Sequence, residues 1–187
     1  MGKLLYITNT SLDGYVEDAT GAFDWVDPGE VFGFITELVR PVGTMLYGRR
    51  LYETMAYWGG PLEDYPPERR DFAQTWQKPE KIVYSRSVTV APTGTTRVER
   101  DFDPDAVRKL KRGVEHDISI GGAELAGLAL EADLVDECHL FVNPVIVGGG
   151  KPAFTAGLRR RLELVEARPF GTGVIYLHYR VRAGRLD

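Results

Sequence analysis

The sequence alternates short, β-rich apolar runs with segments of helical spacing along most of its length. The apolar residues of the first predicted helix, 28–40, recur every three or four positions, and Pro28 lies near its start. Strands that alternate with helices predict a mainly parallel sheet with helices on both faces. The predicted strands are 3–8, 44–47, 81–85, 95–98, 117–120 and 137–143, and the other helices are 48–55, 68–76, 103–112 and 123–130.

The C-terminal part of the chain breaks this alternation. Residues 162–167 and 174–181 both show the period-two pattern of half-buried strands, which predicts an antiparallel hairpin at one edge of the sheet. No repeat or Pro/Ser-rich linker divides the 187 residues, so we expect one domain over 1–187. The expected fold class is α/β, with three layers (α/β/α) and a mainly parallel sheet.

Composition excludes several function classes. The chain has 23 Lys and Arg against 27 Asp and Glu, a formal net charge of −4, which argues against nucleic acid as a partner. No apolar stretch approaches the roughly 20 residues of a membrane span, and the N-terminus lacks a secretory signal pattern. The single cysteine, Cys138, cannot form an internal disulfide. We therefore expect a cytoplasmic protein that does not bind membranes.

Two of the turns that follow predicted strands carry arginine. In parallel sheets ligands bind beyond the carboxyl ends of the strands. Gly48, Arg49 and Arg50 join a strand to a helix there, where amide N–H groups and guanidinium groups favour phosphate. Ser85 and Arg86 end the next strand and add a hydroxyl and a third guanidinium. The alternative is a set of tight turns with solvated arginines.

A glycine pair lies between the strand that ends at Ile120 and the next helix. Gly121 and Gly122, followed by Ala123 and Glu124, let the backbone approach a ligand closely, and we expect a backbone conformation closed to other residues. No third glycine completes the Gly-x-Gly-x-x-Gly pattern of dinucleotide-binding domains. The alternative is a helix-opening turn without a ligand.

The sequence predicts no metal site and only weak candidates for acid catalysis. The histidines His116, His139 and His178 lack metal-ligand spacing, and no cysteine pair exists. Asp13, in the turn after the first strand, and Glu30, in the first turn of the first helix, are candidate proton donors whose pKa burial would raise. Each is equally compatible with a structural role, as a turn residue or a helix N-terminal charge.

These turns, in this order, resemble the dihydrofolate reductase-like superfamily, and most closely its branch related to the reductase domain of bacterial riboflavin biosynthesis. The resemblance implies NADPH as cofactor, with Gly48, Arg49, Arg50, Ser85 and Arg86 near the adenosine phosphates. It also implies that Gly121 and Gly122 lie near the pyrophosphate and nicotinamide, with a cis peptide bond between them. The matching stretches are 10–16, 46–53, 82–86, 118–125 and 135–152.

Three functions follow from this resemblance. The first is an NADPH-dependent reductase that delivers hydride to a small heterocyclic or phosphoribosylamino-pyrimidine-like substrate. The second is a dihydrofolate reductase, for which Glu30 would supply the acid of the first helix. The third is a non-catalytic nucleotide- or drug-binding module of the same fold. We also expect a homodimer, formed through the edge and apolar face of the C-terminal hairpin.

Overall fold

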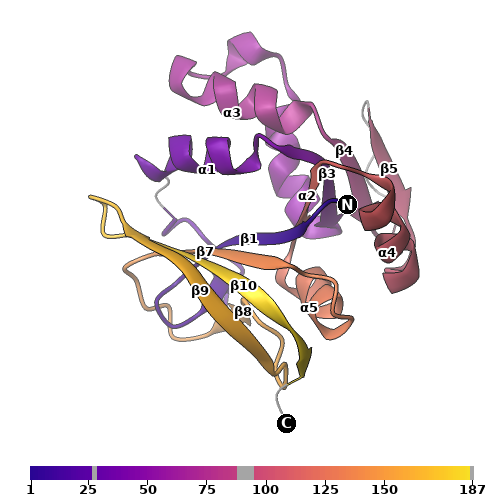
Figure 1. Ribbon diagram of the computed structural model, residues 1–187. Helices are drawn as coiled ribbons and strands as arrows, with labels where there is room; N and C mark the ends of the chain where they lie inside the picture. The colour runs from indigo at the N-terminus through magenta and orange to yellow at the C-terminus, as the bar shows by residue number, and fades with distance from the viewer. Residues whose placement is uncertain (27–28, 88–94, 186–187) are drawn as a thin grey trace.

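The computed structural model describes residues 1–26, 29–87 and 95–185 and contains an eight-stranded central sheet. Its strand order is β5-β4-β3-β6-β1-β7-β10-β9 (Figure 1). The strands from β5 to β7 pair in parallel, whereas β10 pairs antiparallel with both β7 and β9. The predicted fold class is confirmed. The bounds are β1 Leu4–Thr10, β3 Val42–Gly48, β4 Glu80–Tyr84, β5 Thr96–Glu99, β6 Asp117–Gly121, β7 Glu137–Val142, β9 Arg160–Pro169 and β10 Ile175–Arg185.

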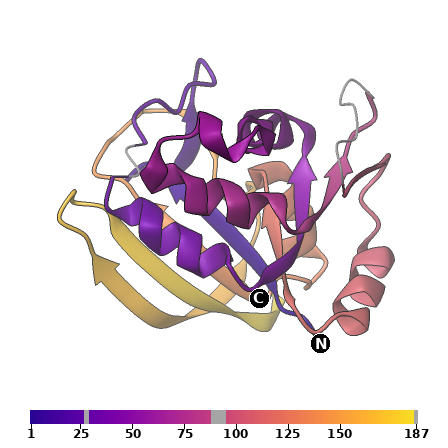
Figure 2. The same cartoon turned by 90° about the horizontal axis from the view of Figure 1, so that it is seen from above.

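Helices cover both faces of the sheet, as the alternation of elements predicts. One face packs against α1, α2 and α3, and the other packs against α4 and α5. Helices α1 and α3 lie side by side over the sheet (Figure 2). The rings of Phe32 in α1 and Phe72 in α3 lie 4.9 Å apart between centroids. The bounds are α1 Val31–Val39, α2 Arg49–Met55, α3 Pro67–Gln77, α4 Pro104–Gly113 and α5 Ala123–Glu131.

The period-two alternation of β1 shows how the sheet serves two cores. Leu4 and Tyr6 point into the core with α4 and α5, and Leu5 points into the core with α1 and α3. All three side chains are at most 3% exposed. A central parallel strand buried on both faces needs apolar residues at consecutive positions, which explains the continuous apolar run.

Helix α4 shows how directly a local motif can set an element boundary. The Asp103 carboxylate accepts a hydrogen bond from the Asp105 backbone N–H at 2.9 Å, and Pro104 occupies the first helical position. For α1 the boundary differs from the prediction, because the helix begins at Val31 and Glu30 is its N-cap residue instead of lying in the first turn. Pro28, predicted near the start of this helix, lies outside the described residues.

A small second sheet, which the sequence analysis missed, pairs β2 (Tyr15–Asp18) with β8 (Gly150–Pro152) antiparallel. A run of three glycines such as 148–150 is typical of a bend between strands, but Gly150 belongs to β8. A Cβ atom at Gly150 would lie 2.0 Å from the Glu17 carbonyl oxygen, so the close approach of the two strands requires glycine.

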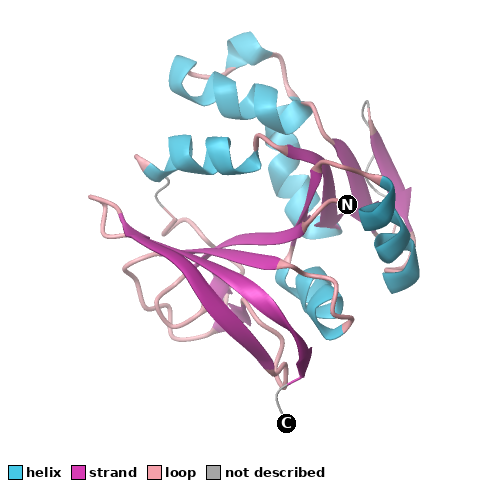
Figure 3. Cartoon of the chain, in the orientation of Figure 1, coloured by secondary structure: helices cyan, strands magenta, loops and turns pink. Residues whose placement is uncertain are grey.

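The long β9–β10 hairpin forms the outer end of the main sheet (Figure 3), with β9 as its edge strand. In the part of the chain that the structure describes, no helix is long and apolar enough to cross a membrane.

Candidate functional site

The predicted ligand-binding turns converge at the carboxyl end of the central strands. Strands β3, β4 and β6 are neighbours in the sheet and end at Gly48, Tyr84 and Gly121. A cavity of about 980 Å³ lies at this edge. All nine residues that the sequence predicted to bind the cofactor line it: Gly48, Arg49, Arg50, Ser85, Arg86, Gly121, Gly122, Ala123 and Glu124. The structure therefore brings together three turns that are separated by more than thirty positions in the sequence.

Gly122 has the backbone conformation that was expected to exclude other residues. Its φ is +96° and its ψ is 120°, a region that side chains with a Cβ rarely adopt. The peptide bond between Gly121 and Gly122 is trans, so the cis bond implied by the family resemblance is wrong for this chain. The positive φ alone turns the chain from β6 into α5. It leaves the first amides of α5 without a side-chain cap beside the cavity.

Three arginines at the cavity differ in how firmly they are held. Arg86 Nε lies 2.7 Å from Asp101 Oδ1, and Arg49 Nη1 lies 2.8 Å from Glu53 Oε1. Among the described residues, Arg50 has no ion-pair partner for its guanidinium. Counting the described residues alone, five basic and three acidic side chains line the cavity, which makes this lining net positive although the whole chain is net negative. This excess favours an anionic ligand.

The remaining wall of the cavity is aromatic and apolar. Phe32 of α1, Trp58 of the turn after α2 and Phe141 of β7 line it, together with the polar Asn9 of β1 and Ser119 of β6. A cavity with an apolar wall and a few polar groups is the usual setting for a small planar ligand. The sequence analysis did not identify this wall, because these residues belong to elements far apart in the chain.

Lys151 is a cavity residue that the sequence analysis missed. Its Nζ lies 3.3 Å from Glu17 Oε1 and 3.2 Å from Glu124 Oε1, so it joins β2, β8 and the start of α5. These three side chains also line a second cavity of about 760 Å³ that adjoins the first. Its sequence signal is weak: a lysine that directly follows three glycines is equally typical of a simple bend between strands.

Asp13 does not line either cavity. Its carboxylate accepts hydrogen bonds from the backbone N–H groups of Val147, at 3.1 Å, and Gly148, at 2.8 Å. Desolvation acts to raise the pKa of Asp13. Hydrogen bonds from Ser11 and from these two amides act in the opposite direction and outweigh it together, so the pKa lies below its ordinary value. The expectation that burial raises the pKa of Asp13 is therefore wrong. The geometry makes Asp13 an anchor for the loop before β8.

Glu30, the second candidate proton donor, also lies outside the cavity lining. Its Oε1 accepts a hydrogen bond from the Thr172 backbone N–H at 3.2 Å, in the turn of the β9–β10 hairpin. This contact ties the start of α1 to the hairpin.

Comparison with known proteins places the chain in a family. Residues 3–176 match the RibD C-terminal domain. The chain belongs to the RibD C-terminal domain family. Membership of the RibD C-terminal domain family supports a reductase-like role, and the glycine and arginine turns lie within the matched residues.

The chain is also similar to one curated protein and two solved structures, and the structures show the fold. The uncharacterized protein YyaP of Bacillus subtilis (strain 168) is 31% identical over 173 residues, covering 90% of this chain and 89% of YyaP. A pyrimidine reductase-like protein from Corynebacterium diphtheriae NCTC has a TM-score of 0.72 at 18% identity, over 98% of this chain and 93% of that one. Dihydrofolate reductase from Enterococcus faecalis has a TM-score of 0.63 at 16% identity, over 96% of both chains. The fold is thus dihydrofolate reductase-like.

Proposed function

We propose that this protein is an NADPH-dependent reductase that transfers hydride to a C=N or C=O bond of a small heterocyclic substrate. The substrate class we favour is a phosphoribosylamino-pyrimidine such as 5-amino-6-(5-phosphoribosylamino)uracil. The single observation that carries the proposal is that nine residues on three separate strand–helix turns line one cavity. The pyrimidine reductase-like structural neighbour agrees with it.

The cavity residues fit the chemical parts of NADPH. The cavity volume of about 980 Å³ lies at the upper end of the range for ligand pockets, which suits a dinucleotide with a substrate beside it. The Cβ-free backbone at Gly122 and the uncapped amides at the start of α5 suit a pyrophosphate. Arg49, Arg50 and Arg86 suit the additional 2′-phosphate that distinguishes NADPH from NADH.

The protein's part in such a reaction is to bind, orient and exclude water. NADPH supplies the hydride when it is bound. The aromatic wall at Phe32, Trp58 and Phe141 holds a flat ring against the sheet edge, and Asn9 offers polar contacts to it. Because Asp13 and Glu30 are engaged elsewhere, we propose that solvent at the cavity mouth supplies the proton.

Two alternatives remain as proposals. A dihydrofolate reductase is compatible with the fold, but the Glu30 carboxylate contacts the hairpin instead of the cavity. A binding module without turnover would keep the positive cavity and bind NADPH without oxidising it.

The test combines cofactor binding with turnover. We expect purified protein to bind NADPH more tightly than NADH and to oxidise it when given a pyrimidine of the stated class, but not with dihydrofolate. Arg86→Ala should weaken NADPH binding by about tenfold or more, because a charge-assisted hydrogen bond contributes about 1.5–3 kcal/mol, and should change NADH binding little. Arg108→Ala, on exposed α4 and outside the cavity lining, is the matched control.

Each alternative has its own outcome. Oxidation of NADPH with dihydrofolate would identify a dihydrofolate reductase. Binding without turnover across pyrimidines, pterins and carbonyl compounds would identify a binding module. Equal affinity for NADPH and NADH in the wild-type protein would overturn the assignment of the arginines to the 2′-phosphate.

A further inference from the structure

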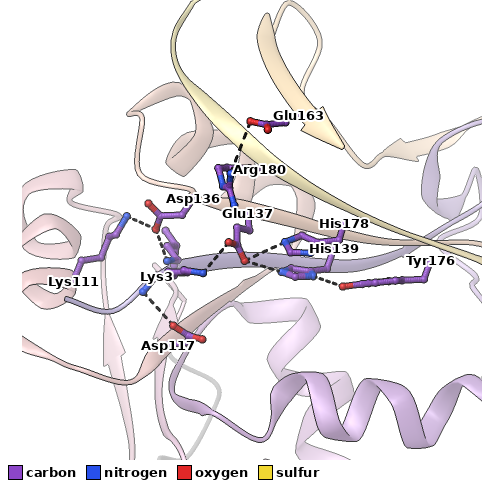
Figure 4. A network of polar contacts seen from close by, with 11 residues as sticks. Lys3, Lys111, Asp117, Asp136, Glu137, His139, Glu163, Tyr176, His178 and Arg180 are labelled. Carbon is purple, nitrogen blue, oxygen red and sulfur yellow. Dashed lines mark hydrogen bonds and ion pairs between the residues drawn. The ribbon is translucent and has the colours of Figure 1, made fainter. Parts of the chain in front are cut away.

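A cluster of two histidines and a glutamate lies on the sheet outside the cavity. Strands β7 and β10 pair antiparallel and place His139 directly opposite His178, while Glu137 precedes His139 by two positions on the same face of β7 (Figure 4). Glu137 Oε2 lies 3.2 Å from His178 Nε2 and 3.6 Å from His139 Nε2. One ligand atom from each of the three side chains lies within 4.8 Å of the others. None of them lines the cavity.

Both histidines of this cluster have a buried nitrogen that faces the same carboxylate. His139 is 3% exposed, and neither buried Nε2 atom makes a hydrogen bond of regular geometry, although Glu137 Oε2 lies close to both. The two rings stack at 4.3 Å between centroids, so both Nε2 atoms face Glu137 from the same side (Figure 4). Buried polar atoms are usually held by hydrogen bonds of regular geometry. Two buried nitrogens that converge on one carboxylate without such bonds indicate a position where one cation contacts all three side chains.

The surrounding contacts hold the three side chains in the forms that bind metal. His139 Nδ1 lies 2.7 Å from the Tyr176 hydroxyl, and in the tautomer that carries its proton on Nδ1 the hydroxyl accepts this hydrogen bond and the Nε2 lone pair is free for a metal ion. Lys3 Nζ donates to Glu137 Oε1 at 2.9 Å, and this leaves Oε2 for a second interaction.

We propose that Glu137, His139 and His178 bind a divalent transition-metal ion, with Zn²⁺ as the favoured ion. Two imidazoles and a carboxylate suit zinc and its neighbours Co²⁺ and Ni²⁺, whereas Mg²⁺ and Ca²⁺ prefer oxygen ligands alone. In a tetrahedral zinc site with bonds of about 2.0–2.1 Å, ligand atoms lie roughly 3.3 Å apart. The two distances from Glu137, 3.2 and 3.6 Å, bracket that value.

The position of the cluster indicates what the ion does. Phe141 follows His139 by two positions on β7 and lines the cavity, so an aromatic residue separates the ion from the cofactor turns. The His178 side chain is 17% exposed and is the least buried of the three proposed ligands. The ion joins β7 to the C-terminal hairpin and stabilises the sheet where parallel pairing changes to antiparallel.

The test is metal binding by the whole protein, free of any affinity tag and treated with a chelator. We expect one equivalent of Co²⁺ to give the visible absorption of a four-coordinate site, Zn²⁺ to displace it, and Mg²⁺ to have no effect. Zn²⁺ should also raise the thermal unfolding midpoint, because an ion that binds only the folded state stabilises it.

Two variants separate binding at this cluster from binding elsewhere. His178→Phe keeps a ring stacked on His139 but removes a ligand, and should abolish the Co²⁺ absorption. Tyr176→Phe keeps all three ligands but removes the hydroxyl at Nδ1, and should weaken Zn²⁺ by about 10–100-fold. His116→Asn is the matched control, because His116 lies in the turn before β6 and contacts Thr44.

Three results would overturn the proposed metal site. Unchanged Co²⁺ absorption in His178→Phe, or loss of it in His116→Asn, would overturn the assignment. So would a wild-type protein that does not bind Co²⁺ or Zn²⁺ at micromolar concentration. NADPH binding, measured in parallel, tests the proposed function separately, because the cluster lies outside the cavity.

Discussion

At the scale of single residues, Gly122 combines an unusual backbone conformation with a place in the cavity lining. A Cβ there would lie no closer than 3.7 Å to its neighbours, so space does not exclude a side chain, but the φ of +96° does. We expect Gly122→Ala to cost about 1–3 kcal/mol if the conformation is kept, and to abolish NADPH binding if the turn relaxes instead. Isothermal titration and urea unfolding measure the two effects.

Gly113 offers a matched control for this substitution. It ends α4, its φ is not positive, and nothing lies within 4 Å of a Cβ added to it. Gly113→Ala should leave NADPH affinity unchanged and stabilise the protein by up to about 1 kcal/mol. Equal NADPH affinity in the two alanine variants would show that the cofactor does not depend on the Gly122 turn.

Lys81 is a buried, titratable residue whose protonation makes the stability of the fold depend on alkaline pH. The residue is 3% exposed, its Nζ donates to the Gln77 and Pro79 carbonyls, and the ammonium lies 4.4 Å from the centre of the Trp76 ring. Desolvation lowers its pKa from 10.5 to about 8. Between these values the unfolded chain binds more protons than the folded protein, so this group makes stability rise with pH there.

Replacing Lys81 with methionine should remove this pH dependence. We expect the free energy of unfolding of the wild type, relative to Lys81→Met, to rise by on the order of 1 kcal/mol between pH 7 and pH 10. Urea unfolding of both proteins at the two pH values measures it. A constant difference would mean that the carbonyl hydrogen bonds keep the ammonium charged throughout.

At the scale of elements, the loops around β2 and β8 depend on contacts that cross the chain. Asp13 holds the amides of Val147 and Gly148, and the Gly14 carbonyl oxygen accepts from the Ala153 N–H at 2.9 Å. Asp13→Asn leaves one acceptor oxygen in place of two. We expect faster hydrogen exchange at the two amides and an unchanged pH profile of turnover.

Glu30→Gln is the companion variant, because Glu30 holds the amide of Thr172 in a different loop. It should affect exchange at Thr172 and leave Val147 and Gly148 unchanged. A fall in kcat of roughly 100-fold in Asp13→Asn with normal amide exchange would instead identify Asp13 as the proton donor.

At the scale of the whole molecule, we expect a second copy of the chain to bind at the β9 edge of the sheet. Strand β9 is the edge strand, and Leu162, Leu164 and Val165 on it are 38–54% exposed. Exposed apolar residues on an unpaired edge favour association. We expect a homodimer with twice the monomer mass of 20.9 kDa in light scattering.

Leu164→Lys should convert this dimer to monomer, because edge lysines oppose strand pairing between copies. Leu128→Lys, on an exposed position of α5, is the control and should remain a dimer. A wild-type protein that scatters as a monomer at micromolar concentration would show that the hairpin is an ordinary sheet edge.

The sequence by itself determined the element types, the fold class and the set of turns around the cavity. These follow from local physics: the alternation of Leu4, Leu5 and Tyr6, the Asp103 cap and the glycines at Gly121 and Gly122 act within a few residues. Because the carboxyl ends of parallel strands meet at one edge, the turns could be placed together without coordinates. Their role in cofactor binding stays a prediction.

Only the tertiary structure decided which side chains far apart in the sequence meet. Nothing local shows that β2 pairs with β8, that Asp13 binds the loop at Val147, or that His139 lies opposite His178. Each of these contacts depends on strand pairing and register over distances of 39 to 137 residues in the chain. Such pairings are set by packing of the whole sheet, and local periodicity carries no information about them.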